Sequence, residues 1–181
     1  MPQRGQMRFE REKFVELLLY FARRGQDEGL VIGSTKLNKL LFFSDFRAYA
    51  KLGSPITGAR YQKLDWGPAP RALLPVRSEL IENGDARFLD SEDWNQVLEP
   101  QRDPNMTLFT EEELFVIDEV FNELRPFNAT AASDYSHWNS PGWNAADEFE
   151  DIPYASARIS TERPPQQVFD FFRQLHGIAT G

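Results

Sequence analysis

The chain has 181 residues, a formal net charge of −8 and no cysteine. Hydrophobic residues make up 41% of it and charged residues 27%, a balance that excludes wholesale disorder. The lack of cysteine excludes disulfides, thiolate zinc sites and cysteine nucleophiles.

Because the chain is acidic, it has no general attraction for phosphate backbones, and we do not expect nucleic acid as a partner. No apolar run approaches the roughly 18 residues that a membrane span needs. Residues 1–11 are polar and charged, without the apolar core of a signal peptide. We therefore expect a cytoplasmic protein that makes no membrane contact.

Two helices open the predicted fold. The first covers residues 10–24 and should end at Gly25, because one face carries apolar residues at i, i+3, i+4 and i+7. The second begins after a cap at Ser34 or Thr35, runs to about residue 52 and is closed by Gly53. This second helix is apolar almost all round, so we expect it to be buried at the centre of the fold.

The middle of the chain predicts a strand over residues 58–65, followed by a Gly-Pro turn at residues 66–70. A helix then runs to residue 83, and residues 86–89 form a second strand. Together the helix and the strand resemble half of a winged-helix unit. Another strand is expected around residues 94–98.

The C-terminal part is again helical. Thr110 and Glu113 form a capping box that opens a helix ended by Pro126. A short helix follows over residues 130–138, then a turn at residues 140–143, and a last helix after Pro165. The prediction is an α+β, mainly helical single domain over residues 1–181, with its core in about residues 10–175. It has a central buried helix and a few short strands.

Catalytic chemistry has little support in the sequence. His137 could act as a general base with Asp134 or Asp147, or bind a metal with nearby carboxylates, but no second ligand motif accompanies it. We favour a helix-end residue that bonds a backbone carbonyl. Asp45 could form an acid site with Asn38 and Asp65, although a buried hydrogen-bond network is the simpler interpretation. We expect no enzyme, no cofactor and no metal.

Three surface features allow two interpretations each. The basic residues of region 36–77 could touch DNA, but we favour solvated residues paired with Asp and Glu; they are Lys36, Lys39, Arg60, Lys63, Arg71 and Arg77. Acidic residues 147–151, with Phe149 among them, form either a solvated face or a site for a basic partner segment. Trp66, Trp138 and Trp143 are mostly core candidates, although interface anchors also fit.

Three segments resemble a known family. The run Thr35-Lys-Leu-Asn-Lys-Leu-Leu-Phe-Phe-Ser-Asp45 looks like the K-L-x-K-L-L-Y/F helix of the Panacea (SocA-like) antitoxin domain. Tyr61 to Trp66-Gly67-Pro68 is similar to the aromatic strand and Gly-Pro turn of that domain. His137 and Pro141-Gly142-Trp143 resemble its S-H-x-x-x-P-x-W element. The resemblance spans residues 10–155. The turn departs from the usual Tyr-Gly-Pro-Val, and Phe42-Phe43-Ser44-Asp45 departs from the usual tyrosines.

The resemblance implies a non-enzymatic bacterial or phage antitoxin that binds and neutralises a toxin encoded beside it. One branch of the family delivers its toxin to an AAA+ protease, so such a protease is a second partner that the resemblance leaves open. Leu40, Leu41 and Gly67 look structural. The candidates for toxin binding or for the family motifs are Lys36, Lys39, Asp45, Tyr61, Trp66, Gly67, Pro68, Arg71, His137 and Trp143.

Two rival functions remain at this stage. One is a DNA-binding transcriptional regulator, built on the winged-helix-like unit of residues 34–89. The other is a hydrolase or metal-dependent enzyme that uses His137 with carboxylates.

Overall fold

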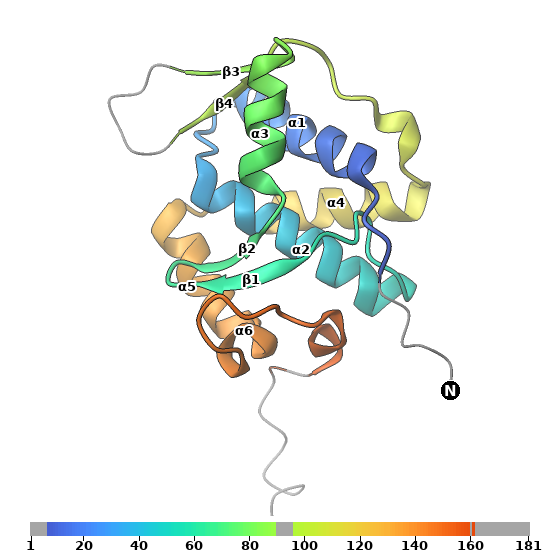
Figure 1. Cartoon of the computed structure of the whole chain (residues 1–181), viewed down its shortest axis with the longest axis vertical. Coiled ribbons are helices and arrows are strands. Elements are labelled where there is room, and N and C mark those ends of the chain that lie inside the picture. The colour runs from blue at the N-terminus through green and yellow to red at the C-terminus, as the bar shows by residue number, and fades with distance from the viewer. Residues whose placement is uncertain (1–6, 90–95, 160, 162–181) are drawn as a thin grey trace, which may run out of the picture.

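The structure is a computed structural model that describes residues 7–89, 96–159 and 161 (Figure 1). The part described is mainly helical, with two small antiparallel strand pairs, which confirms the predicted α+β class. Its helices are α1 (Arg11–Asp27), α2 (Ser34–Leu52), α3 (Leu73–Glu82), α4 (Glu111–Leu124), α5 (Ala129–Asn139) and α6 (Pro141–Ala145). The strands are β1 (Tyr61–Leu64), β2 (Gly67–Pro70), β3 (Ala86–Phe88) and β4 (Leu98–Pro100). Two 3₁₀ turns complete it, η1 (Met106–Leu108) and η2 (Tyr154–Arg158).

Helix α2 crosses the middle of the molecule, as its all-round apolar pattern predicts (Figure 1). It packs against α1, α4, α5, β2 and η2. Gly53 ends it in the left-handed conformation expected, with φ 88°, and its N–H donates to Tyr49 O. The expected cap at Ser34 or Thr35 is wrong. Gly33 is the N-cap and makes no side-chain bond, because Ser34 is already the first helical residue.

The apolar face of α1 is buried against α2 and β4, and this helix runs past its expected end. Gly25 lies inside α1, so the prediction of a left-handed cap at Gly25 is wrong. A glycine is needed there because an added Cβ would overlap the side chain of Ile32. The capping box of α4 is confirmed. The Glu113 N–H donates to Thr110 Oγ1 at 3.2 Å, and the Thr110 N–H donates to Glu113 Oε2 at 2.9 Å.

Strands β1 and β2 form a two-stranded ribbon in which Tyr61 lies opposite Pro70, and Leu64 opposite Gly67. Residues 66–70 were expected to be a turn only, which is wrong because Gly67–Pro70 forms strand β2. Prolines fit there because every strand of a two-stranded sheet has an unpaired edge.

The chain returns to the ribbon along the other edge of β1. The Phe149 N–H donates to Lys63 O at 3.0 Å, the Lys63 N–H to Glu150 O at 3.0 Å, and the Ile152 N–H to Tyr61 O at 2.8 Å. The ribbon therefore has α2 and α5 beside β2, and residues 149–152 along β1.

The second strand pair, β3 with β4, follows α3 and confirms the expected strand near residue 86. β4 begins at Leu98, and residues 94–95 of the strand expected there lie outside the described residues. Residues 140–143 are not the expected turn, since Pro141 begins α6 in the first position, where proline fits a helix. The last helix expected, after Pro165, also lies outside the described part. No helix in the part described is long and apolar enough to cross a membrane.

Asp45 is fully buried on α2 and is surrounded by hydrogen-bond donors. It accepts from the Thr57 N–H at 2.6 Å, the Thr57 hydroxyl, the Tyr61 hydroxyl at 2.7 Å and the Tyr154 hydroxyl at 3.3 Å. Burial raises the pKa of Asp45, and these hydrogen bonds oppose that rise. This is the buried network that the sequence favoured. Neither Asn38 nor Asp65 hydrogen-bonds to Asp45, so the geometry does not form the acid site considered for them.

We expect Asp45→Leu to lower the free energy of unfolding by roughly 2–5 kcal/mol, because it leaves several buried donors without an acceptor. Urea denaturation of the full chain measures this change. Asp27→Leu is the control, since Asp27 is exposed on α1 and should change stability by less than about 0.5 kcal/mol. An unchanged urea midpoint for Asp45→Leu would contradict the network.

Candidate protein-interaction surface

The three sequence motifs meet at the tip of the β1–β2 ribbon. From α2, Lys39 Nζ donates to the carbonyl of Pro68 at 3.3 Å. From α5, the hydroxyl of Ser133 donates to the carbonyl of Trp66 at 3.0 Å. The ribbon tip is thus held by helices that precede and follow it in the chain, and their hydrogen bonds fix its backbone.

The third motif, His137 with Trp143, forms an aromatic stack next to β1. The rings of His137 and Trp143 lie parallel, with centroids 4.1 Å apart, and Trp143 Nε1 donates to Leu64 O at 3.0 Å. Lys63 Nζ lies 4.6 Å from the centre of the Trp143 ring and donates to Ala146 O at 3.0 Å. This stack joins α5 and α6 to β1.

His137 is placed as a packing residue. Burial lowers its pKa and nearby Lys39 lowers it further, whereas the charge of Asp134 and a hydrogen bond to the backbone of Asp65 oppose this. Its Nε2 is buried without a partner. In the part described, neither Asp134 nor Asp147 hydrogen-bonds to the ring, and no cluster of histidine and carboxylate groups could hold a metal ion. The geometry therefore fits the favoured helix-end interpretation and does not orient His137 as a base.

Gly67 lets the ribbon approach the two helices closely. Its φ is 101°, a conformation that side chains rarely adopt. An added Cβ would overlap the hydroxyl of Ser136 and lie 2.8 Å from Lys39 Nζ. The structural role expected of Gly67 thus has a specific cause, and Leu40 and Leu41 are likewise fully buried.

Lys36 and Lys39 are buried, so the expectation that they are solvated and paired with carboxylates is wrong. Lys39 is 1% exposed, and burial lowers its pKa to about 7. Lys36 Nζ donates to the carbonyl of Arg125, the C-cap residue of α4, at 2.9 Å, and burial lowers its pKa too. Both side chains bind backbone carbonyls because neighbouring elements enclose this part of α2.

The other basic residues of region 36–77 divide in two. Arg60 Nε and Arg71 Nε both donate to Asp151, at 2.9 and 2.7 Å, which confirms the expected pairing with an acidic residue. Arg77 is buried instead and donates to Ser34 Oγ and Gln96 Oε1, both at 2.7 Å. The solvated interpretation is therefore wrong for Arg77.

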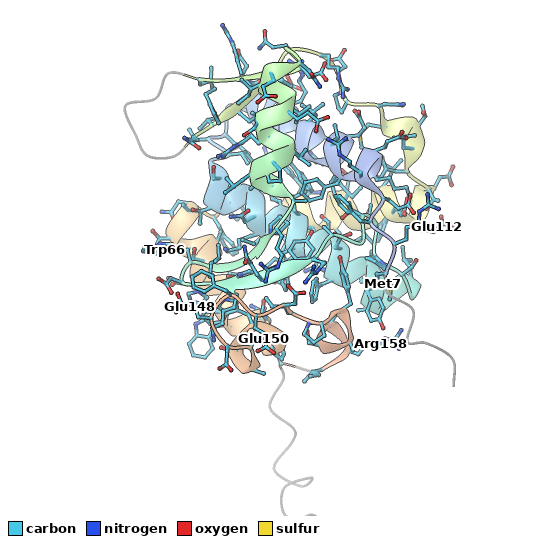
Figure 2. The ribbon with its side chains drawn as sticks, in the orientation of Figure 1. Met7, Trp66, Glu112, Glu148, Glu150 and Arg158 are labelled. Atoms are coloured by element: carbon cyan, nitrogen blue, oxygen red, sulfur yellow. The ribbon has the colours of Figure 1, made fainter. Side chains whose placement is uncertain are left out.

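Three aromatic side chains are exposed on the segments that meet at the ribbon tip. Trp66 is 68% exposed in the β1–β2 turn, and Trp138 is 82% exposed in the last turn of α5, so the core interpretation of both is wrong. Trp143 is only partly buried. Phe149 is 59% exposed and has a φ of 63°. We call Trp66, Trp138 and Phe149 the ribbon-tip surface. Figure 2 shows Trp66 and Glu148, the neighbour of Phe149, at this end of the ribbon.

The candidates from the sequence thus fall into separate groups. Asp45 and Tyr61 belong to the buried network, Lys36 to the end of α4, and Arg71 to the pair with Asp151. The candidates that gather at the ribbon tip are Lys39, Trp66, Gly67, Pro68, His137 and Trp143. Sequence reasoning missed Thr57 and Tyr154 as partners of Asp45, because no local pattern links residues that far apart.

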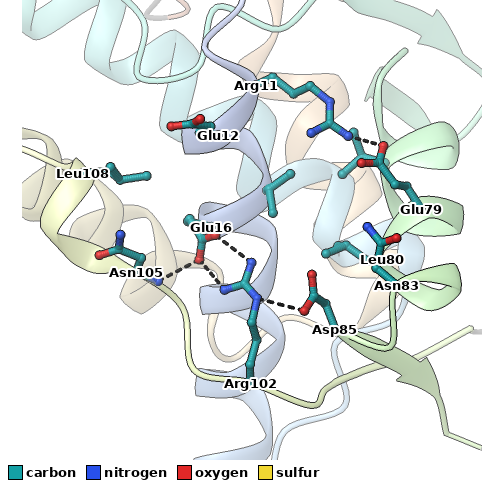
Figure 3. Close-up of a pocket in the computed structure, with 12 residues that line it drawn as sticks. Arg11, Glu12, Glu16, Glu79, Leu80, Asn83, Asp85, Arg102, Asn105 and Leu108 are labelled. Carbon is teal, nitrogen blue, oxygen red and sulfur yellow. Dashed lines mark hydrogen bonds and ion pairs between the residues drawn. The ribbon is translucent and has the colours of Figure 1, made fainter.

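A cavity of about 350 Å³ lies between α1, α3 and the segment before η1 (Figure 3). Most of its charged groups pair with one another. Arg102 binds both oxygens of Glu16, at 2.7 and 2.9 Å, and approaches Asp85 at 3.2 Å. Arg11 pairs with Glu79. None of the motif candidates lines this cavity, and its ion pairs join α1 to α3 and to the segment before η1.

Burial of Lys39 predicts a dependence of stability on pH. Its folded pKa of about 7 lies below the ordinary 10.5, so between these values the folded chain has lost a proton that the unfolded chain keeps. The free energy of unfolding should therefore rise with pH from about 7 to 9, by at most about 1.4 kcal/mol per unit. Lys39→Met should flatten that rise in denaturation curves, whereas Lys51→Met, on the exposed end of α2, should keep it.

Gly67→Ala should destabilise the chain by roughly 2–4 kcal/mol, since it adds a steric overlap to an unfavourable φ. Gly84→Ala is the matched control. Gly84 has φ 78° but open space around it, so only the backbone cost of about 1 kcal/mol is expected. Thermal unfolding compares the stability of the two variants. Equal losses of stability would show that the ribbon does not approach α2 and α5 closely at Gly67.

One of three comparisons with known proteins gives a match. The model of the family described as "Antitoxin SocA-like, Panacea domain" matches residues 37–144, from α2 to α6. No curated protein matches the chain, and no solved structure does. Since the match covers more than half of the chain and includes all the elements that meet at the ribbon tip, this chain belongs to the SocA-like Panacea antitoxin domain family.

Proposed function

We propose that this protein is an antitoxin that binds and neutralises a toxin encoded beside it, and that the ribbon-tip surface makes the contact. The supporting observation is that the segments of the family motifs are fixed by contacts on one side and exposed to solvent on the other. On the inner side, Lys39, Gly67 and Trp143 fix the ribbon by close contacts. On the outer side, Trp66 and Trp138 project from the same segments into solvent. Exposed tryptophans on a fixed backbone are typical of the residues that dominate protein interfaces.

The wider setting belongs to the same proposal. We propose a cytoplasmic bacterial or phage protein, folded as one domain over residues 1–181 with its core in about residues 10–175. Its function requires no catalysis by His137, because that ring is held by Trp143 and is not aligned with a carboxylate. Delivery of the toxin to an AAA+ protease, as in one branch of the family, would make the chain an adaptor, and the half-life of the toxin distinguishes this from neutralisation by binding alone.

The alternative function, DNA binding, has less support from the geometry. The β3–β4 hairpin does follow α3, as in a winged-helix unit. However, α2 is buried, and the exposed side chains of α3 include Leu74 and Glu79. Arg77, the basic residue of α3, is turned inward to Ser34 and Gln96. A recognition helix needs basic or polar side chains facing the groove.

Growth rescue tests the proposed function. The neighbouring open reading frame is expressed in a bacterial host, with and without this chain. We expect that its product arrests growth, that wild-type chain restores growth, and that the two proteins co-purify. Trp66→Ala should weaken both effects because it truncates a central aromatic contact. Phe115→Ala should weaken neither, since Phe115 is equally exposed (67%) but lies on α4.

The same strains separate binding from delivery to a protease. An unchanged toxin half-life with restored growth indicates neutralisation by binding alone, whereas a half-life shortened by the chain indicates an adaptor. A harmless neighbour, or an arrest that wild-type chain does not relieve, would contradict the proposed function.

A further inference from the structure

We infer that the ribbon-tip surface accepts a basic segment of its partner, one that presents arginine or lysine beside apolar side chains. This inference deepens the proposed function and rests on it for the partner being a protein. It names the chemistry of the contact and follows from the distribution of charge around the three exposed aromatics.

The carboxylates near the ribbon tip are exposed and form no ion pair within the described part of the chain. They lie in the β1–β2 turn, on α5 and in the segment after α6, and they are Asp65, Asp134, Asp147, Glu148 and Glu150. Elsewhere acidic residues are commonly paired, as in Lys13–Glu113, Lys51–Glu119 and Arg24–Asp118. The ribbon tip therefore gathers five carboxylates that no ion pair among the described residues neutralises.

The nearby cations neutralise only part of this charge, because three of them face these five carboxylates and Asp151. Lys63 is held by the carbonyl of Ala146 and the ring of Trp143. Arg60 and Arg71 both bind Asp151. The negative potential at the tip consequently repels nucleic acids and acidic proteins, and it attracts a basic segment.

The aromatic side chains favour the same ligand. Arginine and lysine bind the faces of tryptophan and phenylalanine rings, and a carboxylate beside the ring can hold the same cation. The chain itself contains a ring, a cation and a carboxylate in contact where α1 meets α4. There, the Arg24 guanidinium lies 4.1 Å from the centre of the Phe121 ring and pairs with Asp118 and Glu28. In the chain, Asp65 directly precedes Trp66 and Glu148 directly precedes Phe149, so each exposed ring has an acidic neighbour in the sequence.

Phe149 adds a conformational argument. Its φ of 63° is unfavourable for a bulky residue, yet the side chain is exposed and adds little to the core. Glycine would accept this φ without strain. The variant Phe149→Gly should therefore keep or raise the melting temperature while it removes one ring from the surface, which separates a loss of binding from a loss of folding.

The test uses the full chain and two short synthetic peptides, one alternating arginine with leucine and one alternating glutamate with leucine. NMR follows the indole N–H signals of Trp66 and Trp138 during titration. We expect the arginine peptide to shift both signals, and the glutamate peptide to shift neither. Binding of the arginine peptide should weaken between about 50 and 500 mM salt, because exposed charges are screened.

Variants locate the contact. Three variants should each raise the dissociation constant several-fold. They are the double variant Trp66→Ala with Trp138→Ala, the double variant Asp147→Asn with Glu148→Gln, and Phe149→Gly. Two control variants should leave it within about twofold, in line with screened, distant charges. They are Glu82→Gln, an exposed acid on α3 that pairs with none of the described residues, and Phe115→Ala on α4.

Three results would overturn the inference. The arginine peptide could shift neither indole signal, the glutamate peptide could bind as tightly as the arginine peptide, or the ribbon-tip variants could bind the arginine peptide as the wild type does. No toxin is present in this titration. If the peptide titration fails but growth is rescued, only the inference of a basic ligand is rejected. If growth is not rescued, the proposed function is rejected, whatever the titration shows.

Discussion

The structure depends on how the polar groups of α2 are satisfied, because this helix is enclosed on nearly every side. The three charged side chains that it buries each reach a different neighbour. Lys36 binds the end of α4, Lys39 binds β2, and Asp45 binds β1 and η2. An unpaired buried polar group costs roughly 1–3 kcal/mol, so these contacts do more than fill space. They specify which element lies on which side of α2, since a shifted neighbour would leave a charge or a hydroxyl without a partner.

This arrangement explains why the family motifs are dispersed in the sequence and meet in space. The ribbon tip takes its backbone from β1 and β2, but its position is determined by α2, α5 and α6. Gly67 allows the close approach, Lys39 and Ser133 hold the carbonyls on either side of it, and Trp143 binds the carbonyl of Leu64. An interface built on such a support loses little conformational entropy when it binds.

Much of this fold could be predicted from residue patterns, and the failures have physical causes. The all-round apolar pattern of α2 predicted its burial, and Asp45 within that pattern predicted a buried network. The same argument applied to Lys36 and Lys39 would have predicted their burial, but lysines are usually exposed and were interpreted as such. The exposure of Trp66 and Trp138 could not be predicted, because core and surface tryptophans look alike in one sequence. Strand β2 was missed because its prolines suggest a turn unless the strand is known to lie at an edge.

The segment of residues 149–152 has a consequence for how the ribbon can associate. A two-stranded sheet ordinarily presents open edges, where another chain can add a strand or where identical molecules can aggregate. Here the outer edge of β1 is already hydrogen-bonded to the chain's own backbone, and β2 contains two prolines, which lack an N–H. A partner therefore cannot extend this sheet through its backbone. It must be recognised by side chains, and the same covered edge protects a surface rich in exposed tryptophan from self-assembly.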